Sequence, residues 1–208
     1  LDFNDALYLL HERGKAMQEA VPVGKGKMIA ILGIKTTEII DILKTIEKEK
    51  GICQIANDNA EGQVIVSGNK EKVEFLQNIL KEKKIKSIPL KVSAPFHCSL
   101  MKPAAEKMKN KINETFLNKP RLDIVSNVTA KSENDINTLK KLLIQQIFST
   151  VRWRESLIYM SDKGVKNFVE IGPGKVLSGM VKRSLVSPKC FSINSIADIK
   201  NLENEFKR

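Results

Sequence analysis

The 208-residue chain contains no apolar run long enough to span a membrane, and its first residues lack the pattern of a secretory signal peptide. It has only three cysteines, Cys53, Cys98 and Cys190, and no C-x-x-C pair. A zinc site and a disulfide framework are therefore not expected, and reduced thiols in a cytosol-like compartment are the simple interpretation. With 42% hydrophobic residues, the chain is predicted to be soluble, globular and cytoplasmic.

Aromatic residues are also scarce, at 5% of the chain, and this helps to decide whether the formal net charge of +11 indicates nucleic-acid binding. A nucleic-acid-binding module would combine a continuous basic face with exposed aromatic residues. Here the lysines are interleaved with glutamates, as in 47–50 and 70–74. The densest basic run, Lys83, Lys84 and Lys86, is typical of a solvated helix end. We therefore expect neither a nucleic acid nor a membrane as a partner.

The chain has no G-x-S-x-G, the nucleophile turn of many serine hydrolases. The chain has only two histidines. One of them, His97, lies in S-A-P-F-H-C-S-L-M-K-P-A (93–104) at a predicted strand-to-helix junction. Ser99 is a fair N-cap for the helix and Pro103 is tolerated in its first turn. A histidine beside free backbone N–H groups tends to stay neutral, which suits a general base. The alternative is an exposed loop histidine, and Cys98 is expected to be a small buried residue rather than a nucleophile.

The order of predicted elements indicates an α/β protein with an inserted subdomain. Between flanking glycines and Pro95, the pattern β-α-β-β-α-β predicts a ferredoxin-like subdomain over residues 26–93. Its expected elements are a strand at 28–33, a helix at 37–49, strands at 52–56 and 63–67 around a turn at 57–62, a helix capped by Asn69, and a strand at 86–92.

The main subdomain is expected to comprise residues 1–25 and 94–208. There, helices alternate with strands at 122–126, 167–171 and 190–193, which indicates a parallel sheet.

Arg13 is the second candidate site residue. The first helix carries an apolar stripe of Phe3, Ala6, Leu10 and Met17, and Arg13 falls on it. A guanidinium on such a face needs an anion, and it pairs two-point with a carboxylate. The alternatives are an arginine that reaches solvent or pairs with Glu12 or Glu19.

Four segments together resemble the malonyl-CoA:acyl carrier protein transacylases of fatty acid synthesis, in that family's order and spacing over essentially the whole chain. They are R-G-K-A-M-Q-E-A-V-P (13–22), N-D-N-A-E-G-Q-V-I-V-S-G (57–68), S-A-P-F-H-C-S-L-M-K-P-A (93–104) and V-E-I-G-P-G-K-V-L-S-G (169–179). The resemblance implies an α/β-hydrolase-like main subdomain. It makes His97 the catalytic base, oriented by the backbone carbonyl at Gln146.

The resemblance also assigns substrate-binding roles. Arg13 would bind the malonyl carboxylate, and Phe96 would accompany malonyl selectivity. Asn57 and Asn59 would border the cleft, although Asn-Asp-Asn is equally ordinary turn chemistry. The G-P-G-K segment (172–175) would shape the site wall, since it lacks the spacing of a phosphate loop.

The implied reaction moves malonyl from malonyl-CoA to the phosphopantetheine thiol of acyl carrier protein through a seryl acyl-enzyme, with no metal or cofactor beyond the CoA thioester. A basic rim would favour both partners. Because the family's G-H-S-x-G-E serine segment is missing, we expect the chain to be the C-terminal part of a monomeric enzyme and to be inactive alone. A polyketide-synthase acyltransferase domain and a non-catalytic scaffold remain alternatives.

Overall fold

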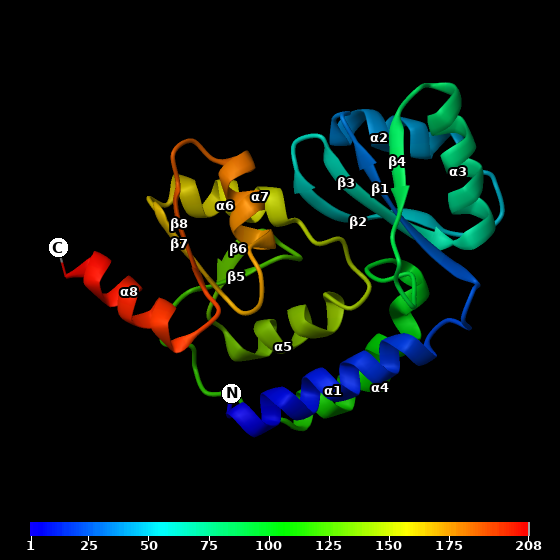
Figure 1. Cartoon of the computed structure of the whole chain (residues 1–208). Coiled ribbons are helices and arrows are strands. Elements are labelled where there is room, and N and C mark those ends of the chain that lie inside the picture. Colours follow the sequence, from blue (N-terminus) through cyan, green and yellow to red (C-terminus); the bar gives the residue numbers. More distant parts are fainter. Residues whose placement is uncertain (208) are drawn as a thin grey trace.

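The computed structural model describes residues 1–207 and consists of two parts that lie side by side (Figure 1). One part is a four-stranded sheet with two helices. The other combines long helices with two small sheets. No helix in the described range has both the length and the apolar character needed to cross a bilayer.

The four-stranded sheet has the element order of the predicted ferredoxin-like subdomain, which confirms that prediction. Its strands occur in the order β2-β3-β1-β4 and every neighbouring pair is antiparallel. Along the chain, the elements are β1 (Gly26–Leu32), α2 (Thr36–Thr45), β2 (Cys53–Ala60), β3 (Gln63–Asn69), α3 (Lys70–Glu82) and β4 (Lys86–Pro89). The subdomain limits of 26 and 93 stay a prediction.

Both helices of this part cover one face of the sheet. Alternate residues of β1 and β3 (Ile29, Ile31, Val64, Val66) pack with residues of α2 and α3 in one buried cluster. Helix α2 ends at Thr45, four residues before the predicted end. The Lys72 ammonium binds the carbonyls of Glu49 at 2.8 Å and Gly51 at 2.9 Å, so these carbonyls of the chain that leaves the helix are paired.

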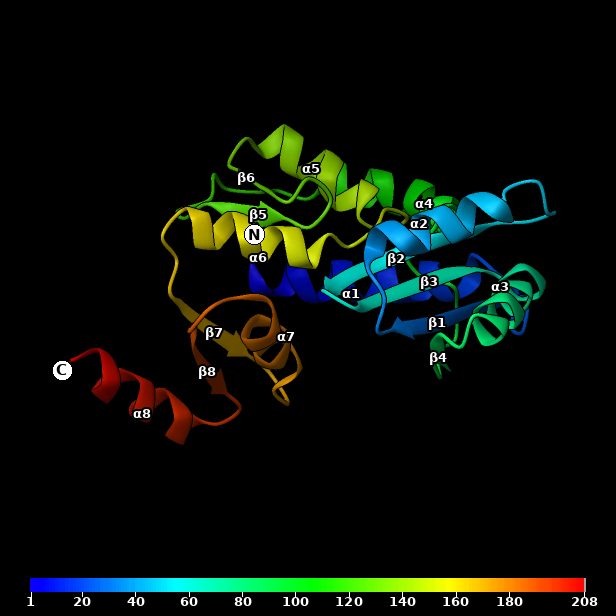
Figure 2. The same cartoon turned by 90° about the horizontal axis from the view of Figure 1, so that it is seen from above.

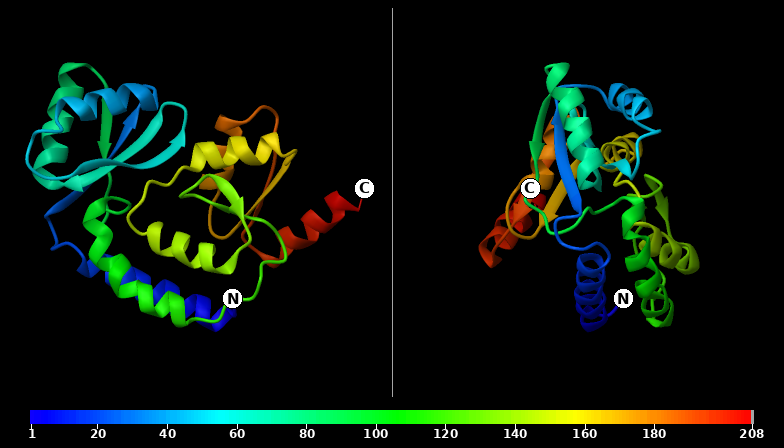
Figure 3. Two further views of the ribbon diagram at one scale, coloured as in Figure 1. Left: turned by 180° about the vertical axis from the view of Figure 1, so that it is seen from behind. Right: turned by 90° about the vertical axis from the view of Figure 1, so that its right-hand side faces the viewer.

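The second part begins with α1 (Phe3–Glu19), which packs along α4 (Lys102–Glu114) as Figure 3 shows from behind. The stripe predicted for α1 is wrong in part, because Phe3 is 73% exposed and Leu10 is 61% exposed. Of the predicted stripe Met17 is buried, and the buried face also carries Leu9 and Ala16. Apolar residues surround much of this helix, so their spacing alone does not select the face that meets α4.

The remaining elements are two strands, two helices and then alternating strands and helices, consistent with the predicted α/β class. They are β5 (Ile124–Ser126), β6 (Lys131–Glu133), α5 (Ile136–Gln145), α6 (Trp153–Asp162), β7 (Asn167–Ile171), α7 (Val176–Ser184), β8 (Lys189–Ile193) and α8 (Ile196–Phe206). The strands β7 and β8 pair in parallel (Figure 2). The strand expected at 122–126 instead pairs antiparallel with β6, because only a four-residue turn separates them.

Candidate active site

His97 lies in the loop between β4 and the 3-10 turn η1 (Ser99–Met101), with a left-handed backbone φ of 57°. The side chain of the next residue, Cys98, fixes the loop through two contacts. The Cys98 thiol donates to the Pro95 carbonyl at 3.2 Å, and its Sγ lies 3.7 Å from the Ser67 hydroxyl of β3. Burial raises the pKa of Cys98, so this side chain is a packed anchor rather than a nucleophile.

Ser99 does not cap the helix that follows, contrary to the sequence prediction. Its backbone N–H and its hydroxyl both donate to Gln54 Oε1, at 2.8 and 2.9 Å. The 3-10 turn separates Ser99 from α4, which begins only at Lys102, so the serine is too early to serve as its N-cap. Ser99 instead ties the His97 loop to the edge of β2.

The His97 ring has a defined tautomer. Nδ1 lies 3.0 Å from the carbonyl oxygen of Gln146, just beyond α5. Because a carbonyl oxygen can only accept, Nδ1 carries the hydrogen, and Nε2 of the neutral ring keeps its lone pair. Burial lowers the pKa of His97 and the charge of Arg13 lowers it further, whereas the carbonyls of Gln146 and Ser149 oppose the shift. The ring is therefore a neutral base at neutral pH.

Arg13 extends from α1 toward the same site, close enough for its charge to lower the pKa of His97. Its Nε is buried and has no hydrogen-bond partner among residues 1–207. The two carboxylates considered as partners are engaged elsewhere, since Glu12 pairs with Lys111 and Glu19 with Lys107, each at 3.0 Å. A partly buried cation without a carboxylate partner is a ready site for an anionic ligand.

The structure places Asn57 and Asn59 within β2, and the turn between β2 and β3 comprises residues 61–62, so the turn predicted at 57–62 is wrong for its first four residues. Asn57 lies opposite Val151 in a parallel bridge, and Asn59 is buried. Phe96 packs against the buried cluster that includes residues of α1 and α4. The binding roles of these three residues stay predictions.

Asp58, between those asparagines, is a site-supporting residue that the sequence analysis did not single out. It is 4% exposed, and Arg154 of α6 grips both its oxygens, with Nη2 to Oδ2 at 2.7 Å and Nε to Oδ1 at 3.0 Å. Its backbone N–H also donates to the Val151 carbonyl. This clamp joins β2 to the segment that follows Gln146. No local signal marks it in the sequence, because an aspartate in the predicted turn at 57–62 is ordinary.

We expect Asp58→Asn to lower the free energy of unfolding of the 208-residue chain by about 2 kcal/mol, because it removes the negative charge from a buried two-point pair with the partly buried Arg154. The matched control is Asp41→Asn. The Asp41–Lys44 pair has a similar length, 2.9 Å, but both side chains are exposed. Urea unfolding should show no measurable loss for the control. Equal losses in both variants would rule out a stabilising role for the clamp.

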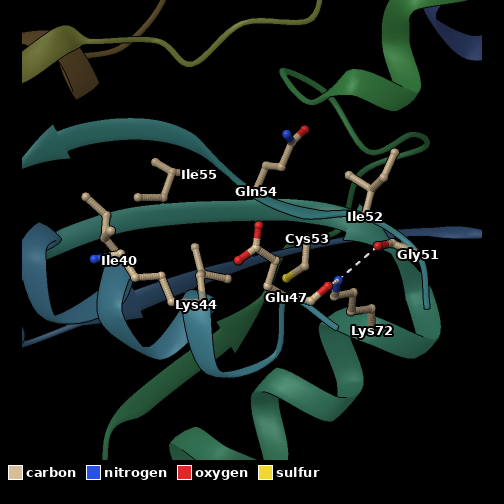
Figure 4. A pocket seen from close by; sticks show the side chains of 10 residues that line it. Ile40, Lys44, Glu47, Gly51, Ile52, Cys53, Gln54, Ile55 and Lys72 are labelled. Atoms are coloured by element: carbon tan, nitrogen blue, oxygen red, sulfur yellow. Dashed lines mark hydrogen bonds between the residues drawn. The ribbon is translucent and has the colours of Figure 1, made fainter. Parts of the chain in front are cut away.

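A groove of about 490 Å³ lies away from His97, between α2 and β2 (Figure 4). Its one nucleophile-type side chain, Cys53, has a pKa raised to about 12 by burial. The Lys72 ammonium at its end is already bound to three carbonyls. The groove therefore offers no activated cysteine nucleophile.

The G-P-G-K segment precedes α7 but does not expose its N-terminus to a phosphate. Glu170 of β7 accepts from the N–H groups of Leu177 and Ser178, at 3.0 and 2.8 Å, and from the Ser178 hydroxyl. A carboxylate thus already occupies the end of the helix dipole that an anion would use. No cluster of three or more metal-ligand side chains occurs in the part of the chain that the structure describes.

Comparisons with known proteins identify the family of this chain. The model of a family described as "Acyl transferase domain" matches residues 1–205. The chain is 40% identical over 204 residues to a malonyl CoA-acyl carrier protein transacylase of Haemophilus influenzae, covering 98% of this chain and 65% of that protein. It thus spans about two thirds of the length of that curated relative.

Solved structures give the same result. The corresponding transacylase from Coxiella burnetii superposes with a TM-score of 0.95 at 33% identity, covering 100% of this chain and 66% of that one. A malonyl-transacylase solved in complex with its type II PKS acyl-carrier protein superposes with a TM-score of 0.92 at 37% identity, covering 98% and 66%.

Proposed function

Because this chain belongs to the acyl transferase domain family, we propose that it supplies the general base and the carboxylate-binding side of a malonyl-CoA:acyl carrier protein transacylase. One observation carries the proposal. A neutral histidine with a free Nε2 lies close enough to a partly buried arginine, itself without a carboxylate partner, for the arginine charge to lower the pKa of the histidine. That combination suits acyl transfer from a substrate that carries its own carboxylate.

In the proposed reaction, a serine outside these 208 residues attacks the thioester carbonyl of malonyl-CoA while His97 Nε2 takes the serine proton. The C–S bond then breaks, and His97 returns the proton to the leaving CoA thiolate. The phosphopantetheine thiol of acyl carrier protein attacks the malonyl ester in turn, and His97 again takes and returns one proton. Arg13 holds the malonyl carboxylate throughout.

The backbone carbonyl at Gln146 takes the place that an aspartate holds in many serine hydrolases. It orients the ring without leaving a second negative charge beside the substrate carboxylate. We propose that Asn57, Asn59 and Phe96 complete the wall of the acyl site. The chemistry requires no metal or cofactor beyond the CoA thioester.

The partner is assigned from the relatives. Their names specify acyl carrier protein, and one related transacylase was solved with such a protein bound. We therefore propose that acyl carrier protein is the acceptor here. We also propose that the enzyme acts as a monomer in the cytoplasm, and that residues 26–93 form an insertion in its main subdomain.

The proposal is tested with two proteins, the 208-residue chain and an extended enzyme in which the segment preceding the match in the Haemophilus influenzae relative is fused ahead of it. The extended enzyme should transfer malonyl from malonyl-CoA to holo-acyl carrier protein. The chain alone should gain no malonyl mass in intact mass spectrometry, because it lacks a G-x-S-x-G serine.

A malonyl adduct on Cys98, Ser99 or any other residue of the chain alone would contradict the assignment of the nucleophile. A folded extended enzyme that binds malonyl-CoA without transferring its acyl group would favour a non-catalytic scaffold instead.

A further inference from the structure

We propose that Asn127 is a positioning residue that sets the tautomer of His97 through Gln146. The side-chain amide of Gln146 donates from Nε2 to Asn127 Oδ1 at 2.9 Å, and the backbone carbonyl of the same glutamine receives His97 Nδ1–H. Gln146 thus links Asn127 to the histidine ring through two hydrogen bonds. The importance of this link for catalysis rests on the proposed function, but the tautomer itself does not.

The Gln146 carbonyl needs support from outside its helix. Gln146 is the C-cap of α5, where the last carbonyls have no intrahelical donor. Its own N–H binds Leu142, but that bond does not fix the direction of its C=O. In the described range, His97 Nδ1 is the donor that reaches this oxygen. The side-chain bond to Asn127 is therefore a second restraint on the residue.

Asn127 is itself held firmly enough to act as a fixed point. It follows β5, and its carbonyl accepts from the Arg152 N–H at 2.8 Å. The Arg152 guanidinium donates to the carbonyls of Val128 and Thr129, and it pairs with Glu155. The turn after β5 is therefore tied to the start of α6 at three successive residues.

The packing around the Gln146 side chain would not hold it in place if its hydrogen bond to Asn127 were lost. Asn127, Gln146 and Trp153 line a cavity of about 230 Å³ together with leucines of α5. The glutamine side chain thus has free volume on one side. Without its bond to Asn127, it could turn into that volume and take the peptide carbonyl with it.

The tautomer matters because burial already keeps His97 uncharged. A neutral imidazole has one protonated and one bare nitrogen, and the hydrogen bond at one nitrogen decides which is bare. With the Gln146 carbonyl in place, Nε2 is bare and can take a proton. If the carbonyl moves, the Nε2–H form becomes competitive, and this form cannot act as a base at that atom.

The test reads the histidine tautomers of the ¹⁵N-labelled 208-residue chain by long-range ¹H–¹⁵N NMR, without substrate. The chain has two histidines, and the exposed His11 serves as a reference in the same sample. In Asn127→Leu, which keeps the size but loses the acceptor, the ratio of Nδ1–H to Nε2–H tautomer at His97 should fall about fivefold, the effect of one ordinary hydrogen bond.

Two variants separate positioning from folding. Asn127→Asp keeps the accepting oxygen and should retain the wild-type tautomer ratio. Gln146→Met removes the side-chain donor but keeps the backbone carbonyl, so it should reproduce the fivefold fall even if Asn127→Leu does not fold. The exposed Asn118→Leu is the matched control. An unchanged ratio in a folded Asn127→Leu or Gln146→Met, or an equal fall in Asn127→Asp, would overturn the proposal whether or not the extended enzyme transfers malonyl.

Discussion

Replacing His97 with alanine should lower malonyl transfer by the extended enzyme by about 10²–10⁴-fold, the usual cost of losing a general base. The physical reason is the free Nε2 of a ring that is partly buried, neutral and held at Nδ1 by the Gln146 carbonyl. Alanine leaves no group that can take the serine proton or return it to the leaving thiolate. Steady-state kcat with malonyl-CoA and holo-acyl carrier protein measures the loss.

The pH profile gives an independent check on His97. Its pKa is lowered from the ordinary value of 6.5, so the neutral base persists to a more acid pH than in an unperturbed histidine. Transfer by the wild-type extended enzyme should therefore be constant around pH 7 and fall only once the pH drops below this lowered pKa. The matched control is His11→Ala on α1, which should keep both the rate and the profile. Near-normal turnover by His97→Ala would refute the assigned role.

Replacing Arg13 with alanine should lower kcat/KM for malonyl about 10- to 100-fold, because the substrate carboxylate would then be buried without a charged partner. Acetyl transfer should be retained or increased, since an acetyl group has no carboxylate to leave unpaired. The partly buried position of Arg13 and its unpartnered Nε are the structural basis of this expectation. Comparing kcat/KM for the two acyl groups in both enzymes measures it.

Two controls sharpen the Arg13 prediction. Arg13→Lys keeps the charge but loses the two-point contact, so it should lie between wild type and Arg13→Ala for malonyl. Lys15→Ala removes an exposed charge from the same helix and should leave the selectivity unchanged. An equal loss on malonyl and acetyl in Arg13→Ala would mean that the arginine holds α1 in place and does not recognise the carboxylate.

The sequence predicted best those features of the fold that depend on residues close together in the chain. The order of helices and strands, and the α/β class they imply, follow from periodicity along single segments. The turn predicted at 57–62 was too long, because Asn and Asp favour turns in isolation, whereas here β2 continues to Ala60 by pairing with β3 and with Val151 and only residues 61–62 form the turn. Tertiary pairing overrode the intrinsic preference of these residues.

The supporting residues of the site could not be predicted in the same way. Arg154 is 96 residues from Asp58, and Gln146 is 19 residues from Asn127. Neither pair shares a helix face or a strand register, so no repeat in the chain marks them. Such contacts are created by the packing of elements against each other, and only the three-dimensional structure reveals them.

Gly26 is far from His97 in sequence, yet its substitution would affect the His97 loop, and this limits how a mutational screen for activity can be interpreted. The chain enters the four-stranded sheet at Gly26 and leaves it after Pro89, and a Cβ at Gly26 would lie 2.3 Å from Cδ of Pro95 in the loop that follows. Any side chain there must displace a rigid ring two residues before His97. A map of activity-reducing substitutions will therefore include positions that never meet a substrate, and sensitivity to substitution overstates the size of the reacting centre.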